Sequence, residues 1–293
     1  MTDRYAGRVL RTKASRSSSL RLLNDRDRDD VLQLCDRDPV VNVFVSSRVH
    51  EAGLDPVRLG GQMWGFTPGG KLTSACYAGA NLVPVGATSA ATTAFAGRAR
   101  LQGRRCSSIV GPAEAVGQMW ELLRPYWGQP REIREAQPVM AISGSPRVAP
   151  DSELRRVRPS ELDVLLPASV AMFTEEVGVS PLGPDGGAAY RARVAELIAL
   201  GRAFARIEDG RVMFKAEIGA VTPHACQVQG VWVRPDLRGQ GLAVAGMAAV
   251  VQEALRSIAP VVSLYVNDFN APARAVYRKV GFTELATLTS ILF

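Results

Sequence analysis

The run Gly230-Val-Trp-Val-Arg-Pro-Asp-Leu-Arg-Gly-Gln-Gly-Leu-Ala243 joins a β-branched segment to a glycine turn and then to an alanine-rich segment. This pattern predicts a strand, a short loop and a helix, with residues 238–243 at the start of the helix. Unpaired backbone N–H groups and the positive end of the helix dipole favour an anion there. Gly239 and Gly241 lack the Cβ that would obstruct a ligand close to this backbone. The run therefore predicts a phosphate-binding turn.

A second motif follows the helix and reads Leu264-Tyr-Val-Asn-Asp-Phe-Asn-Ala-Pro-Ala-Arg-Ala-Val-Tyr-Arg-Lys-Val-Gly-Phe282. Through these two motifs the chain resembles the GNAT superfamily of acyl-CoA N-acyltransferases, from about Leu154 to the end. In that family the loop matching Arg238-x-x-Gly241-x-Ala243 binds the pyrophosphate of coenzyme A. The second motif of the family has an Asn, a helix, a Tyr and a closing Gly-Phe, and the matching residues here are Asn270, Tyr277, Gly281 and Phe282.

Turn-forming residues are concentrated in Ser143-Gly-Ser-Pro-Arg-Val-Ala-Pro-Asp151, which interrupts every periodic pattern. We therefore expect an α/β (α+β) chain of two domains joined by this segment. The expected parts are a basic flexible tail over 1–21, an α/β domain over 22–145 and a GNAT domain with a mixed central sheet over 152–293. With 293 residues, 47% of them hydrophobic, the chain can bury a core in each domain.

The first domain alternates helical and strand patterns. Helices are expected at 28–35, 38–50 and 113–123, and strands at 61–67, 71–77, 81–85, 105–110 and 138–142. This order is compatible with a degenerate second GNAT-like fold, but no counterpart of the Arg238–Ala243 loop is present. Ser107–Pro112 could bind an anion or simply begin a helix. This half also resembles an amino-terminal domain of unknown function found before GNAT domains, and the chain resembles tandem GNAT proteins in which one half keeps the cofactor loop.

The second domain follows the order of elements in the family. Strands are expected at 154–157, 203–208, 212–221, 227–233 and 261–266, and helices at 159–176, 187–200, 240–257 and 271–280. Between Phe282 and Phe293 there is room for one strand or a tight pair. The usual final strand is therefore short or missing, which leaves open that a strand of the first half completes the sheet.

The resemblance implies that the strand containing Val231, Trp232 and Val233 diverges from the strand at 264–266. Backbone groups in the gap would pair with the pantetheine arm, and one N–H would bind the acetyl oxygen as charge develops. The residues expected to bind acetyl-CoA, the acyl donor, are Val231, Trp232, Val233, Arg238, Gly239, Gln240, Gly241, Leu242, Ala243, Val244 and Asn270. Asn270 could also cap the last helix, and Trp232 could simply pack beneath the acceptor cleft.

The resemblance also implies that Tyr277 donates a proton to the departing thiolate. A phenol is protonated at neutral pH because its ordinary pKa is about 10. The alternative is a tyrosine that only fills the core beneath the helix. No Cys or Ser stands with a base in a pattern that suggests a covalent intermediate, so we expect direct attack by a bound amine.

The general base is harder to identify, because Tyr265 stands where some relatives have a carboxylate. Glu217 is the first choice, acting directly or through water, and a glutamate that is merely solvated or salt-bridged beside Lys215 is an equal alternative. His224 would titrate near neutral pH, but it follows Thr-Pro in a segment typical of an exposed turn. The pair Glu175-Glu176 could attract a cationic amine or lie on an ordinary helix surface.

Composition narrows the class of protein. The net charge of +7 owes much to six basic residues within 1–21. Aromatic and basic residues do not alternate repeatedly there, so a solvated tail is expected rather than a nucleic-acid-binding arm. No segment approaches the roughly 20 apolar residues of a membrane span, and no secretory signal is evident. The four cysteines lack metal-ligand spacing. We therefore expect buried free thiols, no metal and a cytoplasmic location.

Together these patterns predict an acetyl-CoA-dependent N-acetyltransferase that acetylates an unidentified amine, on a small molecule or a protein, in a ternary complex. The alternative is a catalytically weak or inactive acetyl-CoA-binding regulatory or scaffold protein, since no standard base is evident. A homodimer is compatible with the sequence. Neither a membrane nor a nucleic acid is expected as a partner.

Overall fold

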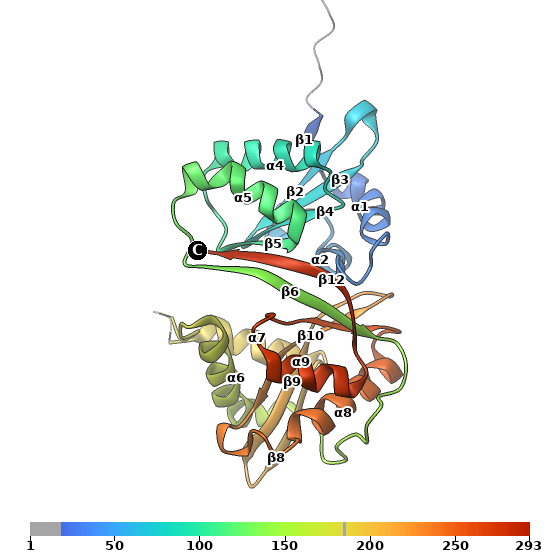
Figure 1. The fold of residues 1–293 in the computed structure, drawn as a ribbon, viewed down its shortest axis with the longest axis vertical. Coiled ribbons are helices and arrows are strands. Elements are labelled where there is room, and N and C mark those ends of the chain that lie inside the picture. Colours follow the sequence, from blue (N-terminus) through green and yellow to red (C-terminus); the bar gives the residue numbers. More distant parts are fainter. Residues whose placement is uncertain (1–18, 184–185) are drawn as a thin grey trace, which may run out of the picture.

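The computed structural model describes residues 19–183 and 186–293 and shows two units stacked along the long axis of the molecule (Figure 1). Most of the basic tail predicted over 1–21 lies outside these residues. One mixed sheet of 12 strands runs through both units in the order β1-β2-β3-β4-β5-β12-β6-β11-β10-β9-β8-β7. The predicted α/β class with a mixed central sheet is therefore confirmed.

The first half of the chain supplies the strands of one end of the sheet and the helices packed on them. Its elements are β1 (Leu20–Leu22), α1 (Arg28–Cys35), α2 (Val43–Ala52), α3 (Pro56–Leu59), β2 (Gly61–Phe66), β3 (Ser74–Gly79), β4 (Asn81–Val85), α4 (Ser89–Gln102), β5 (Ser108–Pro112), α5 (Ala113–Trp127) and β6 (Glu132–Ile142).

The second half matches the predicted order of elements closely. Its elements are β7 (Arg155–Arg156), α6 (Leu162–Val177), α7 (Ala188–Ala199), β8 (Ala203–Glu208), β9 (Arg211–Val221), β10 (Cys226–Val233), α8 (Leu242–Ser257), β11 (Val262–Tyr265), α9 (Ala271–Val280) and β12 (Thr283–Leu292). Only one strand follows α9, and β6 of the first half pairs with both β11 and β12. A strand of the first half therefore does complete the sheet.

Helix α4 was missed by the sequence reading. It is rich in Ala, with Phe95 and Leu101 as its only large apolar residues, so large apolar side chains do not mark its buried face. Ala91, Ala96 and Ala99 are buried together with Phe95, and these small side chains let the helix approach the sheet closely. The sequence feature that indicates the start of this helix is its N-cap residue, Thr88. The Thr88 hydroxyl accepts a hydrogen bond from the amide of Ala91 at 3.3 Å.

The two halves repeat one topology. Reading the sheet inward from its two ends gives β1 to β5 on one side and β7 to β11 on the other, and β12 and β6 meet in the middle. Each half has one parallel pair, β4 with β5 and β10 with β11, and in each a helix connects the paired strands. The first half is therefore a second copy of the same fold without the glycine loop, as the degenerate-repeat interpretation expected.

The last strand of each half is exchanged with the other half. β12 lies between β5 and β6, pairing Leu292 with Ser108 on one side and with Glu132 on the other. β6 in turn lies between β12 and β11, where Val139 pairs with Tyr265. Because each strand closes the other half's portion of the sheet, the halves share one hydrogen-bonded framework.

Side chains from both halves also share buried clusters. Ile291 of β12 is 1% exposed and packs in the cluster that contains Val116 and Met119 of α5. A second cluster joins Val43 of α2 to Ala220 and Ala225 of the second half. These contacts bury apolar surface across the boundary, so we expect the halves to unfold together.

Truncating Ile291 tests this coupling. Ile291→Ala removes buried methyl groups of the second half from the core of the first, and we expect a loss of about 3 kcal/mol in the free energy of unfolding. Because the halves share strands, urea unfolding followed by circular dichroism and by tryptophan fluorescence should show one common transition at lower urea.

The matched control is Leu285→Ala on the same strand, whose side chain is 58% exposed and should change stability little. Two separate transitions, with only one of them displaced by Ile291→Ala, would contradict a shared framework.

Candidate functional site

A cleft of about 510 Å³ opens where β10 and β11 separate. These parallel strands pair at only two positions, Cys226 with Val262 and Gln227 with Ser263. On its other edge β11 pairs with β6 along its whole length, from Val262 to Tyr265. The polar and aromatic side chains that line the cleft come from both halves of the chain: Glu132, Arg134, Gln137, Glu175, Glu176, Gln229, Trp232, Tyr265, Asn267, Phe269, Asn270 and Tyr277.

A bulge in β10 lies at the point of separation. The register between β9 and β10 shifts between Gln229 and Trp232. Gly230 has φ +59°, and a Cβ there would lie 3.0 Å from Cδ of Glu217 and 3.0 Å from Cε of Met172. A side chain at this position would be strained and crowded, so glycine permits the bend that turns β10 away from β11.

Beneath the bulge lies a buried ion pair. Lys215 is 1% exposed, and its Nζ lies 3.1 Å from Oε2 of Glu217. Gln229 donates from Nε2 to Oε1 of the same carboxylate at 2.9 Å. Glu217, the first choice for the base, is thus engaged by two partners and does not line the cleft. Glu217 is therefore a buried glutamate in a salt bridge with Lys215, as the alternative to a base expected.

The glycine loop presents free backbone donors at the start of α8. Gly239 has φ +79° and Gly241 φ +86°, and the space where a Cβ would stand is open within 4 Å at both. Over the described residues, no group accepts a hydrogen bond from the amides of residues 239–243, whereas the amide of Val244 bonds to the carbonyl of Gly241 at 3.0 Å. Five consecutive free amides at a helix N-terminus favour an anion.

Arg238 fixes this loop to the end of α6. Its Nη2 lies 2.7 Å from Oε2 of Glu175, and its Nε donates to the carbonyl of Val233 at 3.0 Å. The indole Nε1 of Trp232 donates to the other oxygen of Glu175 at 3.2 Å. The Glu175 carboxylate is therefore neutralised by Arg238, and Trp232, 9% exposed, is held against α6.

Tyr277 and Asn270 reach the cleft from α9. Tyr277 is 7% exposed, and its hydroxyl has no hydrogen-bond partner among the described residues. Burial, together with the negative charge of Glu176, raises the pKa of Tyr277. Asn270 accepts from the amide of Ala273 at 3.2 Å and so caps α9. Tyr277 is thus a protonated, unengaged phenol facing the cleft over a wide range of pH.

Glu176 is the cleft carboxylate without an ion-pair partner among the described residues. The walls of the cleft desolvate its carboxyl and raise its pKa, against the lowering effect of Arg134, although the side chain keeps access to solvent. A glutamate with a raised pKa in a cleft can accept a proton more effectively than an ordinary surface glutamate.

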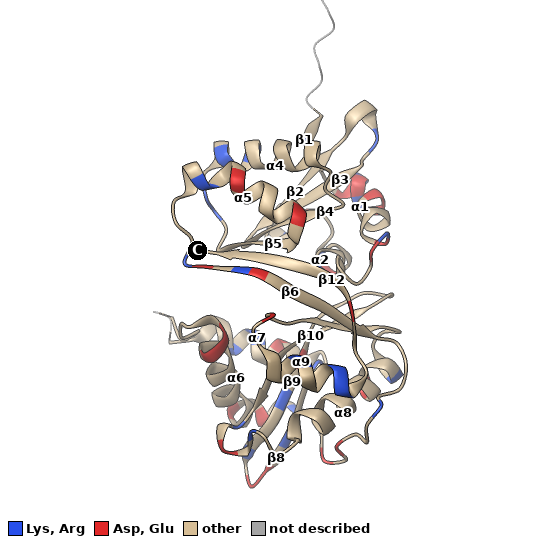
Figure 2. Ribbon diagram, in the orientation of Figure 1, with Lys and Arg blue, Asp and Glu red and all other residues tan. Residues whose placement is uncertain are grey.

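The first half contributes one wall through β6, and sequence reasoning missed it. Arg134 pairs with Glu132 in a bidentate contact, with Nε 2.9 Å from Oε1, and donates from Nη2 to the backbone carbonyl of Glu176 at 2.8 Å. Gln137 donates to Oδ1 of Asn267 at 2.8 Å. Figure 2 shows these alternating charges at the start of β6. No local motif reveals this wall, because it results from the strand exchange.

Not all of the residues singled out from the sequence line the cleft. Val231 lines the cleft, whereas Val233 ends β10 beside it. His224 is about half exposed, and its Nε2 lies 3.7 Å from Oδ1 of Asp36. It does not line the cleft. The cysteines at 35, 76, 106 and 226 are buried free thiols, as predicted. In residues 19–183 and 186–293, no group of three or more His, Cys, Asp or Glu could hold a metal ion, and no helix has the length and hydropathy to cross a membrane.

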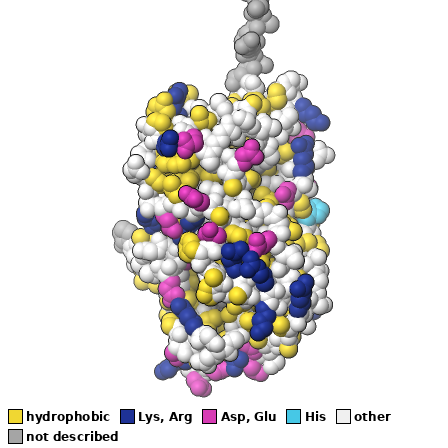
Figure 3. All heavy atoms as spheres, in the orientation of Figure 1, with side chains coloured by type: hydrophobic (Ala, Val, Ile, Leu, Met, Phe, Trp, Pro, Cys, Tyr) yellow, Lys and Arg dark blue, Asp and Glu magenta, His cyan; other side chains and the backbone are white. Residues whose placement is uncertain are grey.

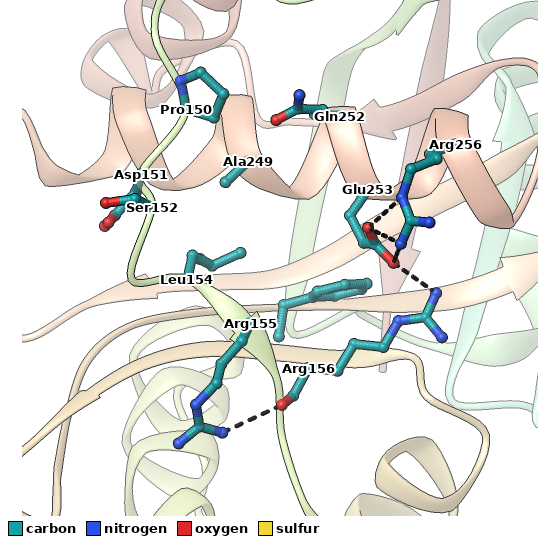
Figure 4. Close-up of a pocket in the computed structure, with 11 residues that line it drawn as sticks. Pro150, Asp151, Ser152, Leu154, Arg155, Arg156, Ala249, Gln252, Glu253 and Arg256 are labelled. Carbon is teal, nitrogen blue, oxygen red and sulfur yellow. Dashed lines mark hydrogen bonds and ion pairs between the residues drawn. The ribbon is translucent and has the colours of Figure 1, made fainter.

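A larger cavity, of about 760 Å³, lies where the segment after β6 crosses α8 (Figure 4). Its charged groups are all paired: Arg156 and Arg256 share the carboxylate of Glu253, at 3.0 and 2.7 Å. Asp151 pairs with Arg206 and Arg155 with Glu161, partners that lie outside the cavity lining. On the face seen in Figure 3, acidic and basic side chains are interspersed without a continuous basic stripe. The cleft between β10 and β11 is therefore the candidate site.

Comparison with family models matches residues 188–282 to the acetyltransferase (GNAT) family. Residues 188–282 form a GNAT domain. Residues 61–165 match a domain of unknown function, DUF4081, which fits the expected amino-terminal relative. A comparison with curated proteins found no match. The GNAT match spans the glycine loop and Tyr277, and members of the family use acetyl-CoA.

Solved structures of GNAT proteins share the fold over nearly the whole chain. An acetyltransferase from Sphaerobacter thermophilus is 16% identical, with a TM-score of 0.58 over 93% of this chain and 95% of its own. One from Colwellia psychrerythraea is 13% identical, with a TM-score of 0.56 over 94% and 99%. A tandem GNAT protein from the clavulanic acid biosynthesis pathway is 15% identical, with a TM-score of 0.54 over 93% and 98%. These likenesses establish the tandem architecture around the GNAT domain.

Proposed function

We propose that this protein is an acetyl-CoA-dependent N-acetyltransferase that transfers an acetyl group to an amine by direct attack in a ternary complex. The observation that carries this proposal is the run of free amides at residues 239–243 beside a cleft made by separated parallel strands. In the GNAT family that arrangement holds the pyrophosphate and directs the pantetheine arm between the strands.

The residues present fit coenzyme A in charge and in backbone geometry. The amides of residues 239–243 would hold the pyrophosphate, and the cleft-facing backbone at Val231 and Trp232 would accept the pantetheine arm. Asn270 caps α9 through Oδ1 and leaves its side-chain amide available to the cleft. Bound there, acetyl-CoA would supply an activated thioester, and a backbone N–H of the separated strand would stabilise the developing oxyanion.

We assign the proton transfers to Tyr277 and Glu176. The C–N bond forms as the C–S bond breaks. Glu176 takes a proton from the attacking amine, and the Tyr277 hydroxyl gives one to the departing thiolate. Glu176 replaces Glu217 as the proposed base, because Glu217 is held by Lys215 and Gln229 and does not line the cleft. The negative charge of Glu176 also attracts a cationic acceptor.

A substitution in the loop tests the cofactor site. Gly241→Glu places a negative side chain in the open space beside the free amides, and we expect at least about a 100-fold loss of coenzyme A affinity by isothermal calorimetry, since like charges repel at close range.

The matched control is Gly128→Glu in the first half. Gly128 also has positive φ, +76°, and open space around its would-be Cβ, so both variants bear the same backbone strain. If Gly241→Glu binds coenzyme A as tightly as Gly128→Glu, the placement of the pyrophosphate is wrong.

The pH dependence of kcat tests the proton transfers. Because Glu176 must be deprotonated and its pKa is raised, kcat should rise with pH through a value above the ordinary glutamate pKa of about 4.3. Because the Tyr277 pKa is also raised, no loss of kcat should follow up to about pH 10. Glu176→Gln should remove the acid limb, and Tyr277→Phe should lower kcat at every pH by about tenfold or more.

Tyr126→Phe is the control for the loss of a hydroxyl, since Tyr126 is 59% exposed in the first half. An acid limb that persists in Glu176→Gln would assign the base elsewhere. Saturable acetyl-CoA binding without turnover on any amine would favour a regulatory protein instead of an enzyme.

A further inference from the structure

We propose that the acceptor is a primary amine on an aromatic body that has no carboxylate, an arylalkylamine in chemical class. This inference rests on the proposed acetyltransferase activity and concerns the acceptor side of the same cleft. The acceptor binds as an ammonium ion and loses one proton to solvent, so that its nitrogen has a lone pair. The neutral amine then forms the C–N bond as the C–S bond breaks and gives a second proton to Glu176, while the thiolate takes a proton from Tyr277.

The charges of the cleft leave one site for a cation. Glu132 is paired with Arg134, and Glu175 is paired with Arg238. Among the described residues that line the cleft, Glu176 is therefore the one charged side chain without an ion-pair partner, and its charge is negative. A single unpaired carboxylate suits an acceptor with one positive charge, and a polyamine would leave its further charges without partners.

Among the described residues, Arg134 is the one Lys or Arg that lines the cleft. Its side chain is 11% exposed, and its Nε and Nη2 are engaged by both oxygens of Glu132 and by the carbonyl of Glu176. The carboxylate of an amino-acid acceptor would have to compete with Glu132 for this guanidinium, or lie near Glu176. Both outcomes cost binding free energy, so the cleft disfavours α-amino acids.

Exposed aromatic side chains form the remaining wall. Phe269 is 69% exposed and Tyr265 41% exposed, and both line the cleft, as does Met172. Aromatic and thioether groups favour an aromatic ligand by stacking and edge contacts. A tethered cation beside these rings gains a further attraction to their faces. The unengaged Tyr277 hydroxyl, on a side chain 7% exposed, lies at the reacting end.

The test compares tryptamine with tryptophan, which differ by one carboxylate, and with spermidine, a polyamine. With the full chain and saturating acetyl-CoA, thiol release should give kcat/KM for tryptamine at least about 100-fold above that for tryptophan, because the carboxylate meets uncompensated negative charge. The kcat/KM for spermidine should also be lower than that for tryptamine.

Two variants assign the preference to the cleft. Phe269→Ala removes an exposed ring, and it should reduce the preference for tryptamine over butylamine by about tenfold, through KM more than kcat. Glu176→Gln should abolish binding of tryptamine to the protein–coenzyme A complex in calorimetry. The matched control is Glu196→Gln, which changes an exposed glutamate of α7 and should leave the binding of tryptamine unchanged.

Each outcome distinguishes this inference from the proposed function. Equal or better use of tryptophan or spermidine overturns the arylalkylamine assignment while leaving the acetyltransferase intact. If no amine is acetylated, the proposed function fails, and calorimetry still tests recognition: the inference stands if tryptamine binds the coenzyme A complex through Glu176 and tryptophan does not. Absence of tryptamine binding overturns it.

Discussion

The exchange of β6 and β12 between the halves is the constraint on which the candidate site depends. β11 has only a two-residue ladder with β10, so its other edge must be held for the cleft to keep its shape. β6 supplies that edge, and Val139 pairs directly with Tyr265. The same strand brings Arg134 to the end of α6, where it bonds to the carbonyl of Glu176. One strand therefore supports the sheet and positions the proposed base.

The two copies of the fold differ at the start of the helix that follows β4 in one and β10 in the other. In the first half, β4 runs through Gly86, Ala87 and Thr88 straight into α4, and Thr88 caps that helix. In the second half, the longer segment from Arg234 to Gly241 leaves five amides free at the start of α8. The helix start of one copy is thus capped by its own chain, and that of the other is available to the proposed cofactor. The first copy still matters, because its last strand forms a wall of the second copy's cleft.

Local motifs predicted the parts of the fold that local chemistry determines. The glycine loop, β8 and the Asn-capped α9 were found at their observed places, because glycine turns and caps leave direct marks in sequence. Helix α4 was missed because alanines do not produce an apolar stripe. Strand exchange was only left open, since pairing between β6 and β11 joins residues far apart in the chain. The salt bridge between Lys215 and Glu217 joins residues two apart in sequence and was one of the alternatives, but the sequence did not decide between a base and a salt bridge. The bond from Gln229 to Glu217 and the unpaired state of Glu176 depend on how strands and helices pack in three dimensions.

The central claim is that the glycine loop holds the diphosphate of coenzyme A and directs the thioester between β10 and β11. Hydrogen–deuterium exchange of the full chain, with and without coenzyme A, tests it most directly, because amides that gain a hydrogen-bond partner exchange more slowly. We expect slower exchange in peptides covering residues 239–243 and 229–231. Unchanged exchange in both segments at a saturating concentration of coenzyme A would contradict it.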